Sequence, residues 1–290
     1  MKTGFVHLTD GRQLEYIDNG LASTRALVLH HGSPIEMHIW DSTMQWLTER
    51  GVRAIAYTRP GYGESTRNPE RTVIGNNSDL EAVLTHLGVT EFVSVGWSAG
   101  GPPALASGLL SGCRGVAAIA SPAPFDGEGL DYFAGMPEDF ARESAISSQS
   151  VDAAFEFKQA TVDGLRSLTV EGFVEGFRER PAYAEFEQRY QASFQELVDS
   201  LQRGLTPDAL AYAEDDHSFL KPWGFDLTSL TVPVGVWLGD HDEFIPPGHA
   251  TWLAEHIPNA DLHLLTDQNH ISIVVEYRDE ILNTAIAALD

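Results

Sequence analysis

Residues 92–106 decide how this chain is expected to fold, and they read Phe-Val-Ser-Val-Gly-Trp-Ser-Ala-Gly-Gly-Pro-Pro-Ala-Leu-Ala. The first four residues favour a buried strand, and the Ala- and Leu-rich end favours a helix with prolines in its first turn. Between them lies Gly96-x-Ser98-x-Gly100, whose glycines leave room for a sharp turn. This turn would raise the Ser98 hydroxyl above the sheet edge and aim the Ala99 amide at a developing oxyanion. Ser98 is therefore the predicted nucleophile; the alternative is a glycine-rich connection with a purely structural role.

Composition places the chain among ordinary globular proteins. It has 290 residues, of which 43% are hydrophobic and 21% are charged. No stretch approaches the 18 uninterrupted apolar residues that predict a membrane span, and the first ten residues contain no apolar signal segment. Cys113 is the single cysteine, which excludes an internal disulfide and fits a reducing compartment. We therefore expect a cytoplasmic protein.

The charge balance narrows the class of partner. The chain has 18 Lys and Arg against 42 Asp and Glu, a formal net charge of −24. Such a charge repels nucleic acid and anionic membrane surfaces, so we expect neither as a partner. A neutral or cationic small molecule is favoured as the substrate, and a homodimer is left open.

Short apolar runs bounded by turn residues predict eight strands. They cover residues 3–8, 13–18, 26–30, 52–57, 92–95, 115–121, 232–238 and 260–265. Predicted helices cover residues 40–50, 75–87, 247–257 and 272–289. Strands that alternate with helices predict an α/β fold, here a mostly parallel eight-stranded sheet with helices on both faces.

The strand rhythm stops between residues 123 and 226. Amphipathic helical patterns replace it at 137–147, 150–168, 170–179, 181–203 and 207–214. We therefore predict a core domain of residues 1–122 and 227–290 with a helical cap, or lid, inserted at 123–226. Such an insertion over a strand edge would cover a substrate cavity.

Chemically capable side chains follow several of the predicted strands, and active groups of parallel sheets lie at the carboxyl ends of strands. Ser98, Asp242 and His270 occur in the chain order of a nucleophile-elbow hydrolase. His270 follows the last strand in a polar loop and is the predicted base. Asp242 is preferred as the acid because Asp240 directly follows a glycine and suits a turn; Asp126 is a third candidate.

His241 and His249 are weaker candidates for the base, because both follow the strand before the last one. No spacing of histidines and carboxylates matches a metal site, so neither a metal nor another cofactor is expected.

The loop His31-Gly32-Ser33-Pro34 follows a central strand and is the predicted partner of the elbow. Gly32 lets the backbone approach the site, and the Ser33 amide would be the second oxyanion donor beside Ala99. Pro34 has no amide hydrogen to offer. Trp97 and His31, the neighbours of these groups, are expected to contact the substrate.

On these residues the chain resembles the α/β-hydrolase fold superfamily. The motifs that carry the resemblance are His31-Gly32-Ser33-Pro34, residues 59–65, residues 96–100, Gly239-x-x-Asp242 with Pro246, and His270. The resemblance implies the same roles: Ser98 as nucleophile, His270 as base, Asp242 as acid, and Ser33 with Ala99 as the oxyanion hole. It also implies that residues 59–65 form a structural loop beside the site.

Two residues depart from that family pattern. Asn269 stands where a glycine usually precedes the catalytic histidine, so we expect the histidine loop to be held differently. Ser33 stands where many relatives have an apolar residue, so its hydroxyl is expected to be able to reach the oxyanion as well.

The resulting expectation is a metal-free serine hydrolase for an ester or lactone of a neutral, largely apolar small molecule. The same triad could instead hydrolyse a C–C bond or transfer an acyl group to peroxide without a cofactor. A non-catalytic ligand receptor on a hydrolase fold is an alternative of another class. A dinucleotide-binding enzyme is a weaker alternative, because Gly61-Tyr62-Gly63 lacks a third glycine.

Overall fold

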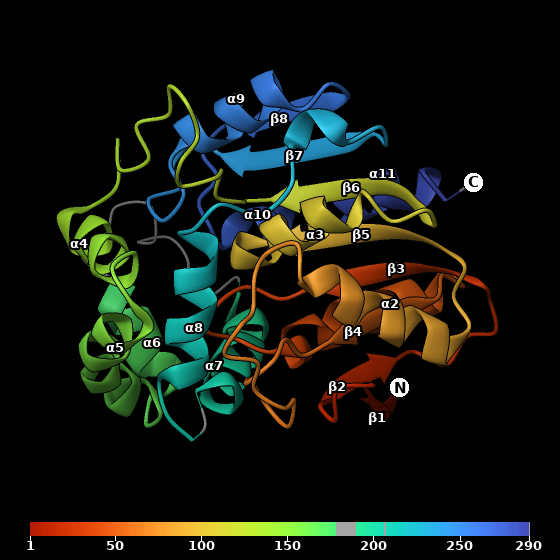
Figure 1. Cartoon of the computed structure of the whole chain (residues 1–290), viewed down its shortest axis with the longest axis horizontal. Helices are drawn as coiled ribbons and strands as arrows, with labels where there is room; N and C mark the ends of the chain where they lie inside the picture. The colour runs from red at the N-terminus through yellow and green to blue at the C-terminus, as the bar shows by residue number, and fades with distance from the viewer. Residues whose placement is uncertain (178–189, 206, 290) are drawn as a thin grey trace.

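The computed structural model describes residues 1–177, 190–205 and 207–289, and one eight-stranded sheet runs through it (Figure 1). The strand order is β1-β2-β4-β3-β5-β6-β7-β8; β1 and β2 pair antiparallel with their neighbours, and all other pairs are parallel. The predicted mostly parallel sheet is therefore confirmed. The strands are β1 (Lys2–His7), β2 (Gln13–Asp18), β3 (Arg25–His30), β4 (Ala54–Tyr57), β5 (Glu91–Trp97), β6 (Cys113–Ile119), β7 (Val234–Gly239) and β8 (Ala260–Leu265).

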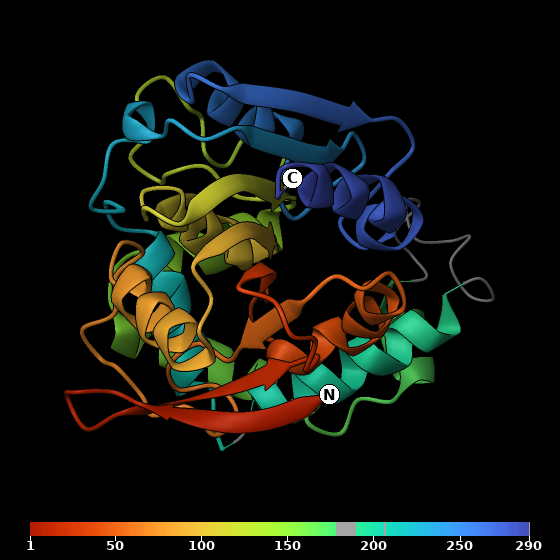
Figure 2. The ribbon, with the colours of Figure 1, turned by 90° about the vertical axis from the view of Figure 1, so that its right-hand side faces the viewer.

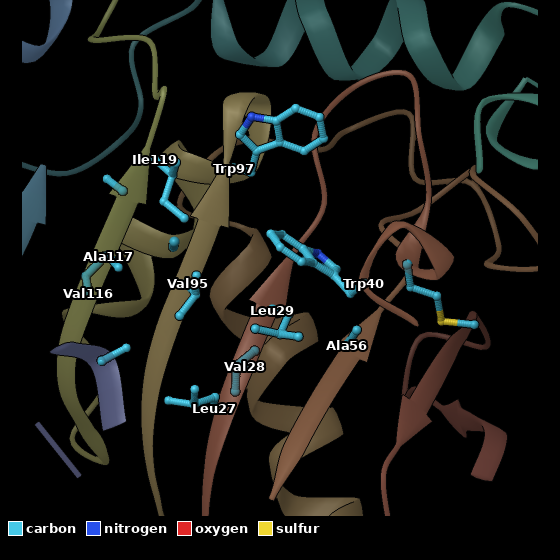
Figure 3. Close-up of a cluster of buried hydrophobic side chains, with 14 of the residues drawn as sticks. Leu27, Val28, Leu29, Trp40, Ala56, Val95, Trp97, Val116, Ala117 and Ile119 are labelled. Carbon is cyan, nitrogen blue, oxygen red and sulfur yellow. The ribbon is translucent and has the colours of Figure 1, made fainter. Parts of the chain in front are cut away.

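Helices cover both faces of the sheet. Helices α2 (Asn76–Leu87) and α3 (Gly101–Ser107) lie on one face, and α1 (Asp41–Glu49) and α11 (Arg278–Ala287) lie on the other (Figure 2). The central strands are accordingly buried on both sides. This burial explains why their sequences are continuous apolar runs. Figure 3 shows such side chains along β3, β5 and β6, with Trp97 at the carboxyl end of β5.

The remaining short elements of the sheet domain lie between these strands and helices. They are the 3-10 helices η1 (Met37–Trp40), η2 (Ser98–Gly100) and η4 (Leu227–Ser229), and the α-helices α9 (Pro247–His256) and α10 (Ser272–Glu276). The predicted helix 272–289 is divided, because the backbone leaves the helical conformation at Tyr277 (φ −101°, ψ 7°). Of the helices that are described, none combines the length and the apolarity that crossing a bilayer requires.

Between β6 and β7 the described chain forms five α-helices, which we name the α4–α8 segment. They are α4 (Glu138–Ser147), α5 (Val151–Leu165), α6 (Val170–Phe177), α7 (Gln191–Gly204) and α8 (Leu210–Phe219). Each corresponds to one of the predicted helical patterns, but 178–179 and 181–189 of those patterns lie outside the described residues. Figure 1 shows these helices gathered beyond the carboxyl ends of the parallel strands.

The loop after β3 is joined to α7 through buried polar groups. The Glu36 amide donates to Ser200 Oγ at 2.9 Å, and that hydroxyl donates back to the Glu36 carbonyl at 2.9 Å. The Glu36 side chain is 1% exposed, and its Oε2 accepts a hydrogen bond from the His38 amide at 3.2 Å. Burial raises the pKa of Glu36 to about 7, although the nearby His38 opposes the rise.

Glu36→Gln should therefore change how stability depends on pH. A carboxyl whose pKa is higher in the folded chain than its ordinary 4.5 binds more protons when folded, so it loses stability as pH rises from 4.5 through 7. The glutamine does not titrate. The free energy of unfolding of the variant, relative to that of the wild type, should therefore increase from pH 5 to pH 8, by up to about 3 kcal/mol. Urea unfolding at both pH values measures this difference. An equal difference at both values would contradict the role given to Glu36.

Candidate active site

The turn after β5 places Ser98 in a strained backbone. Its φ is 56°, in the left-handed region that residues with a side chain rarely adopt. Two glycines make the turn sterically feasible. A Cβ on Gly96 would lie 2.1 Å from the Gly100 carbonyl oxygen, and a Cβ on Gly100 would lie 2.2 Å from the His30 carbonyl oxygen. The turn therefore needs glycine at both positions, and it leaves Ser98 and Ala99 partly exposed.

Asp242 and His270 form the second part of the site. Nδ1 of His270 donates to Oδ2 of Asp242 at 2.7 Å, and both side chains are buried. The other carboxylate oxygen, Oδ1, accepts the amides of Phe244 at 2.9 Å and Ile245 at 2.8 Å. Three donors thus fix the orientation of the carboxylate, and it in turn places the proton of the imidazole on Nδ1.

The loop that carries His270 is held by its neighbour Asn269. Oδ1 of Asn269 accepts the amides of Ile271 at 3.0 Å and Ser272 at 2.9 Å, so the asparagine side chain closes the turn around His270. The indole Nε1 of Trp97 donates to the His270 carbonyl at 3.0 Å. The difference from the family pattern at Asn269 therefore has a local reason: a side chain does here what a backbone turn at glycine would do.

The other candidate acids and bases lie elsewhere. The contacts described for His270 join it to Asp242 and not to Asp240 or Asp126, and Asp126 is exposed. His249 is buried; its Nδ1 accepts the Ala123 amide at 3.1 Å and its Nε2 donates to the Tyr132 carbonyl at 3.0 Å. This histidine thus ties the chain beyond β6 to α9.

Two adjacent cavities open above Ser98. The larger, of about 400 Å³, lies against α5, α6 and α7 and is lined by Ser98 and His270 together. We name it the apolar chamber, because most of its other lining side chains are hydrophobic. The smaller, of about 180 Å³, lies toward α4 and α8 and is lined by Ser98 and Ala99. We name it the polar cavity after Glu143 and Asp216, two carboxylates that line it among mostly apolar side chains. Both cavities share Ser33, Ser98, Phe140, Glu143, Tyr212 and Phe244.

Two lining residues of the polar cavity, Glu143 and Asp216, are bonded to a buried lysine that the sequence patterns did not single out. Lys158 is 1% exposed, and its Nζ donates to Asp216 Oδ2 at 2.6 Å and to Oε1 of Glu143. Tyr212 donates to the same Glu143 oxygen at 2.7 Å. Burial raises the pKa of Asp216 to about 6, against the lowering effect of Lys158. These residues come from α4, α5 and α8, so only the packing of these helices unites them.

The structure describes no grouping of three or more His, Cys, Asp or Glu side chains suited to a metal ion within residues 1–177, 190–205 and 207–289. Beside the polar cavity, the ammonium group of Lys158 pairs with the carboxylates of Glu143 and Asp216.

Ser33 and Ala99, the predicted oxyanion donors, both line the polar cavity next to Ser98. The hydroxyl of Ser33 differs from its expected role. It donates to Oδ2 of Asp215 at 2.5 Å, and a hydroxyl has one proton to give. It is therefore not available to an oxyanion, and the backbone amide of Ser33 is left as the candidate donor.

His31 also differs from its expected role. It is fully buried and lines neither cavity. Its Nε2 accepts the Arg59 amide at 3.0 Å, and its Nδ1 donates to the Gly32 carbonyl at 2.7 Å. Both ring nitrogens thus serve the loop itself, and the expectation that His31 contacts the substrate is corrected. Trp97, in contrast, lines the apolar chamber, with its ring 5.5 Å from that of His270.

Comparisons with known proteins show the family and the fold of the chain. A family model described as the alpha/beta hydrolase family matches residues 27–284. A non-heme haloperoxidase from Rhodococcus erythropolis is 27% identical over 286 residues, which cover 92% of this chain and 92% of that protein. A bifunctional esterase/perhydrolase from Acinetobacter calcoaceticus is 34% identical over 99 residues, or 34% of this chain and 36% of that protein.

Among solved structures, a bromoperoxidase from Bacillus anthracis superposes with a TM-score of 0.72 at 19% identity, over 99% of each chain. At that identity the likeness supports the fold. Because the family model spans most of the chain and its motifs meet at one sheet edge, this protein is an enzyme of the alpha/beta hydrolase family.

Proposed function

We propose that the protein is a serine hydrolase that cleaves an ester or lactone of a neutral, largely apolar small molecule. The observation that carries the proposal is the 2.7 Å bond between His270 and Asp242, with that histidine and Ser98 lining one chamber. A serine hydroxyl is a poor nucleophile at neutral pH and needs such a base. A protein that only binds a ligand has no need of this arrangement.

In the proposed reaction, Ser98 attacks the substrate carbonyl while His270 takes its proton and Asp242 stabilises the imidazolium. The amides of Ser33 and Ala99 bind the oxyanion, which typically stabilises the transition state by about 3 kcal/mol per donor. The tetrahedral intermediate then expels the alcohol, which receives the proton from His270. Water, deprotonated by the same imidazole, cleaves the acyl-enzyme and frees the acid.

The two cavities support the substrate class. The apolar chamber offers Leu165, Leu168 and Phe173 to a hydrophobic group, and about 400 Å³ suits a small molecule. The carboxylates of Glu143 and Asp216 line the polar cavity and share the single positive charge of Lys158, so the group keeps a net negative charge that disfavours an anion. A neutral ester with one apolar portion satisfies both.

We also propose that the core and the inserted helical segment have different roles. Residues 1–122 and 227–290 act as the catalytic core, and residues 123–226 act as a cap. Residues 123–226 supply slightly more than half of the lining residues of each cavity, and the core supplies the others, Ser98 and His270 among them. A cap of this kind excludes bulk water from the reacting groups and selects substrate shape.

A second activity is supported by what the relatives are named for. Peroxide can replace water as the acceptor of the acyl group: its oxygen forms the bond to the acyl carbon, the bond to Ser98 breaks, and His270 takes the peroxide proton. The product is a peracid, and no metal or cofactor is needed. The named activities of the Rhodococcus and Acinetobacter proteins favour this reaction on the same triad.

Ser98→Ala should lower hydrolysis of an activated aryl ester by at least about a thousandfold and leave the fold intact, because only the nucleophilic oxygen is lost. Steady-state kinetics and circular dichroism measure the two effects. A fluorophosphonate probe should label the wild type and not the variant. Ser78→Ala removes an exposed hydroxyl that donates to the Gly75 carbonyl, and it serves as the control. An active or still-labelled Ser98→Ala protein would refute the assignment; an unlabelled wild type would favour a receptor.

With hydrogen peroxide, an ester and bromide present, the wild type should brominate an organic acceptor through the peracid it forms. Omitting the ester, or replacing Ser98 with alanine, should abolish the bromination, because both remove the acyl-enzyme. Absorbance of the acceptor follows the reaction. Hydrolysis without any bromination would exclude perhydrolysis and retain the esterase.

Gly172→Leu should narrow the apolar chamber, which this helical glycine lines. A Cβ there would meet Leu168 at an ordinary 3.4 Å, so the fold should tolerate the change. Hydrolysis should be measured with two series of esters, one lengthened on the acyl side and one on the alcohol side. The rate should fall for esters with long apolar groups and stay unchanged for the shortest ester. Gly164→Leu is the matched control, because Gly164 is also helical and no described atom lies within 4 Å of its added Cβ. Equal effects of both variants would contradict this place for the substrate.

A further inference from the structure

We infer that Asp215, in helix α8, is a positioning residue that sets the oxyanion loop, residues 31–34, for transition-state binding. The inference rests on the proposed function. It concerns a cap residue that lines neither cavity and so cannot touch the substrate. Arg59 lies between Asp215 and the loop and is hydrogen-bonded to both.

Arg59 contributes to fixing the direction in which the loop amide points, together with His31, whose Nδ1 donates to the Gly32 carbonyl at 2.7 Å. Its guanidinium donates to the carbonyl of His31 and, at 3.1 Å, to the carbonyl of Gly32. The Gly32–Ser33 peptide is trans, so its C=O and N–H point in opposite directions. With the Gly32 oxygen held toward Arg59, the Ser33 N–H is turned away from Arg59. Gly32 passes close to the nucleophile, since a Cβ added to it would lie 3.2 Å from the Cβ of Ser98.

Asp215 in turn fixes Arg59. Oδ2 of the carboxylate accepts from Nη2 of Arg59 at 2.6 Å, and Oδ1 accepts from Nε at 3.2 Å. Two oxygens on two nitrogens prevent the planar guanidinium from rotating. Arg71 Nη1 and the Tyr62 hydroxyl donate to the same carboxylate at 3.0 and 3.1 Å. The arginine that orients the loop is therefore held by a group outside the catalytic core.

Asp215 also holds the loop directly. The Ser33 hydroxyl donates to its Oδ2 at 2.5 Å, so the residue with the candidate oxyanion amide is bonded at its side chain to α8. The same hydroxyl accepts from Arg59 Nη2 at 3.2 Å. Ser33 thus has its side chain fixed by an ion pair and its peptide fixed through the preceding carbonyl. Small errors in donor position are costly in catalysis, which gives this rigidity a function.

The buried charges keep the carboxylate in its ionised form. Arg59 and Asp215 are each 1% exposed. Burial alone would raise the pKa of Asp215, but the charges of Arg59 and Arg71 hold it below its ordinary value. At neutral pH the carboxylate is charged and accepts from all its donors. The α4–α8 segment thereby contributes to the oxyanion hole as well as to the cavities.

Asp215→Asn tests the inference because it keeps the size of the side chain and removes its charge. We expect kcat for an activated aryl ester to fall about tenfold or more while KM changes less than about twofold, since only transition-state binding is weakened. A trifluoromethyl ketone adds the Ser98 oxygen and forms a tetrahedral oxyanion. Its inhibition constant should rise by a factor similar to the loss of kcat. The corresponding carbinol forms no adduct, and its affinity should be unchanged.

Glu214→Gln is the matched control. Glu214 is the preceding residue of the same helix, its side chain is 1% exposed, and it pairs with Arg67 and Arg71. Its described bonds reach neither Arg59 nor Ser33. The control should lose thermal stability and keep kcat within about twofold. If Asp215→Asn fails to fold, Ser33→Ala decides: it keeps the amide and removes only the hydroxyl bond, so kcat should fall at unchanged KM.

The outcomes separate this inference from the proposed function. An active wild type with a folded Asp215→Asn of equal kcat overturns the inference alone. A loss of kcat in Glu214→Gln as large as in Asp215→Asn also overturns it, because the effect is then general disturbance of α8. If Asp215→Asn does not fold, an unchanged kcat in Ser33→Ala overturns it. A wild type that neither hydrolyses esters nor reacts with a fluorophosphonate removes the proposed function, and this inference with it.

Discussion

The close approach of two backbone segments is the constraint on which the site depends. The turn after β5 passes so near the end of β3 that a Cβ on Gly100 would fall 2.2 Å from the His30 carbonyl oxygen. No side chain fits there, and nothing in this contact can slide without breaking the parallel pairing of β3 with β5. The left-handed backbone of Ser98 and the path of the loop after β3 are two consequences of the same contact.

A buried ion pair between Arg59 and Asp215 links this region to helix α8 of the α4–α8 segment. Burying Arg59 and Asp215 costs desolvation free energy, and such pairs are often no more stabilising than apolar contacts of equal size. Here the charges have a further use, because the guanidinium needs its full set of acceptors to hold two loop carbonyls. Glu36 and Ser200 add a second link between the same loop and α7. The helices beyond the strand ends are thus joined to the loop after β3 by hydrogen bonds as well as by apolar packing.

The two cavities beside Ser98 differ in the side chains that line them. Hydrophobic side chains of α5, α6 and α7 line the cavity on one side of Ser98, and Glu143 of α4 and Asp216 of α8 line the cavity on the other. A molecule that reaches Ser98 therefore meets both apolar surface and carboxylates. The net charge of −24 acts in the same sense at long range, since it repels anions before they reach the cavity.

The sequence alone predicted much of this protein, because the features concerned are local. Apolar runs of strand length, separated by helical patterns, predicted the eight strands and the parallel sheet. The Gly96-x-Ser98-x-Gly100 turn could be predicted because the steric requirement for glycine lies within five consecutive residues. Ser98, Asp242 and His270 were selected by a topological rule, that strand ends share one edge, and the structure brings Asp242 to His270.

Only the tertiary structure decided which polar groups serve the loop and which face the cavity. The sequence contained His31, the Ser33 hydroxyl, Lys158 and Asp215, but no local pattern stated their partners. Those partners lie on other elements: Ser33 and Asp215 are separated by 182 positions in the chain, and Lys158 and Asp216 by 58. Whether a polar side chain is buried in a network or points into a cavity depends on how distant helices pack. This packing cannot be predicted from the composition of the sequence or from the spacing of its motifs, and only the folded structure shows it.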